Sequence, residues 1–173
     1  MRAVRLLWLL AVTACDGGDA QPDAPVDAPA ACTHARPDLA VATLAGCAEA
    51  GDADGARTVA RFQNPTNVAI GPDGTVYVTD FDNGRLRAIT PDGTTRTVVF
   101  GETFTHPFGL VFGADGMLYV ETDDNDRGGH SIETGTIWRV DTTRLNGNAT
   151  VVARDLGRPR GLAALADGRL VLA

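Results

Sequence analysis

The chain has 173 residues, a net charge of −7 and 44% hydrophobic residues, values typical of a globular protein. All 15 basic residues are arginines, which excludes Schiff-base chemistry, lysine general bases and a phosphate-binding loop that needs lysine. The arginines are scattered and outnumbered by 22 acidic residues, so we expect no nucleic-acid partner.

The first 14 residues have the features of a secretory signal peptide. Two arginines precede an apolar run, residues 6–12, which is too short to cross a bilayer as a helix. Small residues then lead to Cys15, an arrangement that resembles a bacterial lipobox, whose cysteine is lipidated and becomes the mature N-terminus. We therefore expect Cys15 to be a lipidation site; the alternative is an ordinary signal peptide with an incidental cysteine.

Residues 15–37 are predicted to form a disordered tether. They are rich in Asp, Pro and Ala and have almost no large apolar side chains, so burial cannot offset the entropy of ordering them. Regular prolines stiffen such a segment into a spacer. The sequence thus predicts a bacterial cell-envelope protein, periplasmic or on the outer surface, whose folded domain, residues 38–173, is attached to a membrane through a lipid.

Export would place Cys32 and Cys47 in an oxidising compartment. A disulfide between them would close a loop of about 15 residues and stabilise the fold by about 3 kcal/mol. The alternative is two unpaired thiols, since the spacing alone does not give the separation of their Cα atoms.

The folded region repeats one pattern. Pro65, Pro107 and Pro159 each precede an apolar run and then an Asp-Gly pair, at spacings of 42 and 52 residues. Within each unit, short apolar runs are separated by Gly, Pro and Asp turns, as antiparallel strands are. Four such strands make a small sheet, and sheets repeated at this period are typical of β-propeller blades. We therefore predict an all-β protein built from propeller blades.

Residues 50–93 resemble an NHL repeat. The matching segments are a loop with glycine and aspartate at 52–55, Ala-Arg-Phe at 60–62, a proline before the first strand at 65, Tyr-Val-x-Asp at 77–80 and Asn-x-Arg-Leu-Arg at 83–87. The match weakens in the second unit, where Glu121 and Thr122 replace Thr79 and Asp80. NHL proteins are similar to six-bladed propellers of the gluconolactonase/regucalcin, strictosidine-synthase-like and soluble quinoprotein sugar dehydrogenase types. The resemblance implies the fold and does not settle the function.

The predicted strands do not complete a propeller. Residues 39–44 are expected to form an outer strand, two full blades follow, and two strands of a third blade are expected near 160–165 and 169–173. Because a propeller needs at least about four blades, we interpret the domain as an open arc of a truncated, longer protein. The alternative is a ring assembled from several copies of the chain.

The longer connections are expected on one face of the arc. In a meander, the connection between the second and third strands lies on the same side as the entry into the next blade, which gathers residues 46–64, 80–84, 101–106 and 121–135. This face is the predicted binding surface. Its ligand-binding candidates are Asp80, Asp82, His106 and Arg160. The alternatives are a turn-capping role for the histidine and ion pairs with Arg85 for the two aspartates.

The insert at 121–135 offers a candidate metal site. It is nine residues longer than its counterpart in the first unit, since 134 − 83 = 51 against a period of 42. Its oxygen donors suit Ca²⁺ or another divalent cation. The candidates are Asp123, Asp124, Asn125, Asp126 and His130. Their spacing is not that of an EF-hand, and the alternative is a solvated acidic loop held by its own Asx turns.

The sequence has no catalytic motif such as Gly-x-Ser-x-Gly or His-Glu-x-x-His. It therefore favours a binding or scaffold module for a protein, a carbohydrate or another envelope component over an enzyme. The resemblance to six-bladed propellers implies an alternative, namely a metal-dependent lactonase-like hydrolase or a quinone-dependent sugar oxidoreductase.

Overall fold

The computed structural model describes residues 10–11, 42–144 and 149–173. These residues form strands and turns, and none of them belongs to a helix that could span a membrane. Two of them form β1 (Leu10–Ala11), which pairs in parallel with β2 (Ala42–Thr43). Cys15, the rest of the predicted signal peptide and the predicted tether lie outside the described residues.

The first complete sheet has four antiparallel strands in chain order. They are β3 (Pro65–Ile70), β4 (Val76–Asp80), β5 (Arg85–Ile89) and β6 (Thr95–Phe100). In the turn after β3, Asp73 Oδ1 accepts the N–H of Thr75 at 3.0 Å, and Gly74 has a φ of 83°. An aspartate that bonds its own turn and a glycine without Cβ suit this reversal, which confirms the turn predicted from the Asp-Gly pair.

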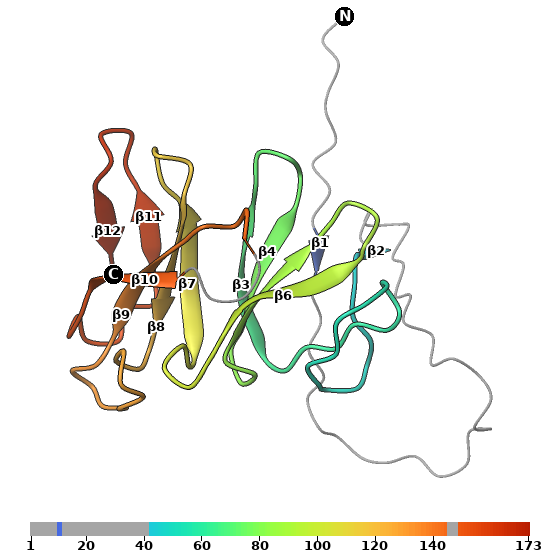
Figure 1. Ribbon diagram of the computed structural model, residues 1–173, viewed down its shortest axis with the longest axis horizontal. Helices are drawn as coiled ribbons and strands as arrows, with labels where there is room; N and C mark the ends of the chain where they lie inside the picture. Colours follow the sequence, from blue (N-terminus) through green and yellow to red (C-terminus); the bar gives the residue numbers. More distant parts are fainter. Residues whose placement is uncertain (1–9, 12–41, 145–148) are drawn as a thin grey trace, which may run out of the picture.

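The second sheet repeats the first. Its strands are β7 (Pro107–Phe112), β8 (Leu118–Thr122), β9 (Thr136–Val140) and β10 (Ala149–Ala153). A hairpin of β11 (Leu162–Ala164) and β12 (Leu170–Leu172) follows. Figure 1 shows the three units side by side, the first in green, the second in yellow to orange and the third in red. The predicted all-β, incomplete propeller is therefore confirmed.

Two apolar cores hold the sheets together. The larger one lies between the two complete sheets and includes Tyr77 and Leu86 from the first and Leu118 and Trp138 from the second. The smaller one covers the other face of the first sheet with the segment that precedes it; its members are Ala45, Ala60, Phe62, Val76, Val78 and Ile89. Because successive side chains of β4 belong alternately to the two cores, this strand is buried along its whole length.

The ends of the arc differ most from the predicted strands. Of the outer strand expected at 39–44, the described part is Ala42–Thr43, which pairs with β1. Val68 and Ile70 on β3 and Val171 on β12 are exposed, although apolar side chains at these positions would be covered by neighbouring blades in a closed propeller.

Cys47 is buried and disulfide-bonded. Both other cysteines, Cys15 and Cys32, lie outside the described residues, so the pairing of Cys47 with Cys32 stays a prediction.

Candidate functional site

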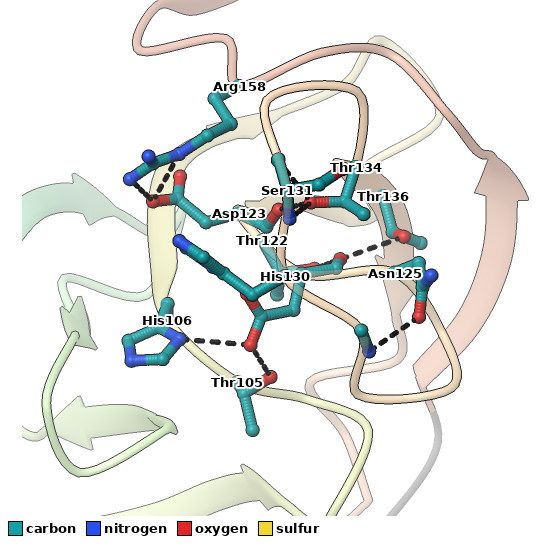
Figure 2. Close-up of polar contacts among 12 residues, drawn as sticks. Thr105, His106, Thr122, Asp123, Asn125, His130, Ser131, Thr134, Thr136 and Arg158 are labelled. Carbon is teal, nitrogen blue, oxygen red and sulfur yellow. Dashed lines mark hydrogen bonds and ion pairs between the residues drawn. The ribbon is translucent and has the colours of Figure 1, made fainter.

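The rim that carries the longer connections brings His106 and the insert together. His106 precedes β7, and its carbonyl oxygen accepts the N–H of Asp123 at 3.1 Å. In Figure 2, His106 and His130 lie close together, the first beside β7 and the second in the insert; their ring centroids are 5.6 Å apart. The predicted convergence of the connection 101–106 with the insert is therefore confirmed.

Asp124 lies between the two histidines. Its Oδ2 accepts a hydrogen bond from Thr105 Oγ1 at 2.5 Å and lies 2.9 Å from His106 Nδ1, while its Oδ1 contacts His130 Nδ1. The Asp124 side chain is 5% exposed, whereas those of His106 and His130 are 41% and 48% exposed. The site thus combines one buried carboxylate with two accessible imidazoles.

Burial raises the pKa of Asp124, but hydrogen bonds from Thr105, His130 and His106 outweigh it and bring the pKa below its ordinary value. The carboxylate is therefore ionised near neutral pH.

The first blade has the same geometry with different side chains. Asn64 and His106 each precede a proline and have φ values of 52° and 50°, a region that residues other than glycine seldom adopt. Asn64 Nδ2 lies 3.5 Å from Asp82 Oδ1, in the place where His106 faces Asp124 one repeat later. The backbone of both blades therefore aims the residue before the proline at an aspartate that follows the second strand.

Asp123 is engaged by two arginines from the start of the third unit. Its buried side chain accepts hydrogen bonds at Oδ2 from Arg158 Nη2 at 2.7 Å and Arg160 Nη2 at 2.9 Å. Arg160 also stacks on Phe108, with its Cζ 4.3 Å from the ring centroid. Arg160, a predicted ligand contact, is thus placed on the rim, where it shares the carboxylate of Asp123 with Arg158.

The five predicted metal ligands of the insert do not converge on one point. Asp126 pairs with Arg154 at 2.6 Å, and Asn125 Oδ1 accepts two N–H groups of its own turn. Asp123 faces the arginines. Among the five, only Asp124 and His130 contact each other. The Asx-turn alternative describes Asn125 correctly, and the partner that completes the cluster, His106, comes from outside the insert.

Asp80 has a structural environment. Its side chain is fully buried and pairs with that of Arg87, also fully buried, at 2.7 Å. It further accepts the N–H of Gln63 at 2.7 Å and a hydrogen bond from Asn83 at 2.8 Å. Because all these bonds lie inside the protein, we correct the prediction that Asp80 contacts a ligand. Arg85 pairs instead with Asp52.

A cavity of about 510 Å³ opens on the same rim, between the end of the first blade and the entry into the second. Two of the predicted ligand-binding residues, Asp82 and His106, line it. The full lining is Phe81, Asp82, Asn83, Gly84, Arg85, Phe100, Gly101, Glu102, Thr105 and His106.

Glu121 is a residue of this rim that the sequence pattern did not predict as part of a site. It is 1% exposed, its Oε2 accepts the N–H of Gly109 at 3.3 Å, and its Oε1 has no hydrogen-bond partner among the described residues. Burial raises the pKa of Glu121 to about 7. The negative charge of Asp123 adds to this increase, whereas the Gly109 N–H, Arg160 and Arg158 oppose it. The available signal was the replacement of Thr79 by a glutamate one repeat later.

Repeated four-stranded antiparallel sheets, set side by side, define a β-propeller type of protein. Residues 62–89, which include β3, β4 and β5, match the NHL repeat. The chain therefore has the repeated sheets of a β-propeller, and its first complete sheet carries a match to the NHL repeat.

No curated protein matches the sequence. Among solved structures, the chain is similar to virginiamycin B lyase from Staphylococcus aureus, with a TM-score of 0.50 and 21% identity over 63% of this chain and 34% of that one. It is also similar to a streptogramin B lyase, with a TM-score of 0.47 and 21% identity over 63% and 33% of the two chains. The chain thus spans about a third of the length of these proteins, and the likeness shows the fold alone.

Proposed function

We propose that this chain is an exported, lipid-anchored propeller module that binds a carbohydrate of the cell envelope on its loop-rich rim. The observation that carries the proposal is the cavity of about 510 Å³ lined by Phe81, Asp82 and the connection 101–106. Binding sites of this kind combine apolar surface with a few polar groups that fix orientation. A sugar ring offers the complementary features, an apolar face and a set of hydroxyls.

The lining offers groups that would suit such a ligand. Phe100 is 54% exposed and has the Arg85 guanidinium 5.9 Å from its ring centroid, while the Phe81 ring lies 5.0 Å from that of His106. Exposed aromatic rings provide flat contact surface at low entropic cost. Asp82 and Asn83 supply carboxylate and amide groups that can bond hydroxyls.

Carbohydrate binding is tested by screening the purified chain on an array of bacterial envelope glycans. We expect binding to at least one glycan, and about tenfold or greater weakening in Asp82→Ala, because a hydrogen bond to a charged group contributes about 1.5–3 kcal/mol. Phe100→Ala should weaken the same interaction. Arg144→Ala, in the turn after β9 on the opposite rim, is the matched control and should bind normally. An array without a hit, or a hit indifferent to both pocket variants, would contradict the proposal.

The anchoring is supported by the sequence of residues 1–37. In the organism that makes the protein, Cys15→Ser should move it from the membrane fraction to the soluble fraction, because one signal for attachment is removed. Cys32→Ser is the control and should leave the distribution unchanged. A Cys15→Ser protein that stays with the membrane would show that the cysteine is incidental.

A second function, catalysis by a lactonase-like hydrolase or a quinone-dependent sugar oxidoreductase, is favoured by one observation. His106 is oriented through Nδ1 by the buried Asp124, as histidine general bases commonly are. Lactone hydrolysis or quinone-supplemented sugar oxidation that is lost in His106→Ala would favour this function over binding alone. Equal activity of the variant and the unmodified protein would remove it.

A further inference from the structure

We propose that His106, Asp124 and His130 form a binding site for a transition-metal ion such as Zn²⁺. One donor atom from each residue lies within 4.8 Å of the other two. The inference goes beyond carbohydrate binding and does not rest on it, because metal binding can be measured directly in the absence of any sugar.

The spacing is close to that of a tetrahedral zinc site. Zinc bonds of about 2.0–2.1 Å to nitrogen and oxygen place neighbouring ligand atoms about 3.3 Å apart. His106 Nδ1 and Asp124 Oδ2 are 2.9 Å apart, and the whole group is contained within 4.8 Å. Small rotations of the two accessible histidines would therefore bring three ligands to bonding distance. Three protein ligands also leave a fourth position for water or another molecule.

The donor set selects the class of metal. Two imidazoles and one carboxylate suit zinc and related transition metals, whereas Ca²⁺ and Mg²⁺ prefer ligand sets made entirely of oxygen. Two of the other acids of the insert, Asp123 and Asp126, are already paired with arginines. The site therefore favours a transition metal over the calcium expected from the acidic composition of the insert.

The carboxylate is held in place before any ion arrives. Thr105 Oγ1 donates to Asp124 Oδ2, and the carbonyl oxygen of Asp124 accepts the hydroxyls of Thr122 and Thr136 at 3.1 Å each. Figure 2 shows Thr105 beside His106, and Thr122 and Thr136 around the base of the insert. Such contacts orient metal ligands and increase affinity.

The insert also fixes the position of His130. On one side, the N–H of Gly129 donates to Asn125 Oδ1 at 2.8 Å; on the other, the N–H of Ser131 donates to Thr134 Oγ1 at 2.9 Å. Thr134 in turn donates to the carbonyl oxygen of Asp123 at 2.7 Å, so the loop is closed onto the end of β8. The extra residues of this insert thus bring a second imidazole to Asp124.

The proposal is tested by titrating the purified chain with Zn²⁺ in a calorimeter and with Co²⁺ by visible absorption. We expect one ion per chain, a cobalt spectrum typical of nitrogen and oxygen ligands, and at least tenfold weaker binding in both His106→Ala and His130→Ala. These histidines are about half exposed, so their variants should fold, and circular dichroism checks this. Asp124→Asn, which keeps the shape of the side chain, should weaken binding similarly.

Two control variants distinguish binding at this site from nonspecific metal binding. His34→Ala removes the third histidine of the sequence, and Asp126→Asn removes an acid of the same insert; both should bind zinc as the unmodified chain does. The proposal is overturned by an absence of zinc binding, by equal loss in the His34 and His130 variants, or by tighter binding of Ca²⁺ than of Zn²⁺. Failure of the glycan screen alongside normal zinc binding would overturn carbohydrate binding alone.

Discussion

Replacing Arg87 with methionine should destabilise the protein by about 3–5 kcal/mol, because one partner of a buried ion pair is removed and the other stays buried without compensation. Arg87 donates to Asp80 at 2.7 Å, to Asp54 at 2.8 Å and to two carbonyl oxygens. Burial already raises the pKa of Asp80, against the bonds from Asn83, Gln63 and Arg87 that lower it. Urea-induced unfolding followed by circular dichroism measures the loss.

The same strand provides the control for this prediction. Arg85→Met breaks an ion pair with Asp52 whose two side chains are 28% and 58% exposed, and exposed pairs contribute about 0–1 kcal/mol. A cost for Arg87→Met no larger than that for Arg85→Met would show that the buried pair does not hold the blade together.

The second blade suggests a compensating substitution. Val120 faces Trp138 across the sheet as Val78 faces Arg87, and Trp138 Nε1 donates to Thr122 Oγ1 at 2.9 Å. A tryptophan–threonine hydrogen bond thus replaces the arginine–aspartate pair one repeat later. Introducing Asp80→Thr together with Arg87→Trp should recover part of the stability lost by Arg87→Met, since no charge then remains buried and unpaired.

The repeat period predicted the fold well because the sequence features that recur in it act locally. Proline entries, Asp-Gly turns and alternating apolar residues each act within a few residues of the chain, and the observed strands follow them. The role of Asp80 was predicted wrongly for a different reason. Its partner Arg87 lies on the next strand, diagonally across a register that the sequence does not specify to a single residue.

Because the sequence does not specify positions to a single residue, it predicts the site only in part. The repeat placed His106 and the insert on one rim, and the structure confirms this. Which acid would meet the histidine was undetermined, because the neighbouring Asp123 and Asp124 lie in a bend after β8 and point to different partners. A shift of one residue would have exchanged their roles, so the His106–Asp124–His130 cluster could be found only from the structure.

Glu121 should make the protein less stable as the pH rises. Its pKa is about 7 in the folded protein against an ordinary value of 4.5, so the folded state binds more protons than the unfolded state between these values. Stability therefore falls as the pH rises from 4.5 to 7 and then levels off. The difference in pKa corresponds to an upper limit of about 3 kcal/mol.

The amide Glu121→Gln has the same shape and does not ionise, so it should match the unmodified protein at pH 5 and exceed its stability by about 1–3 kcal/mol at pH 8. Unfolding in urea at both pH values measures this, with Glu49→Gln, an exposed carboxylate, as the control for charge alone. A variant that gains nothing at pH 8 would contradict the prediction. Because Thr79 fills the same place in the first blade with its hydroxyl fully bonded, the fold does not require an acid there. A buried carboxylate with a raised pKa that lies near Asp123, Arg158 and Arg160 is typical of a functional site.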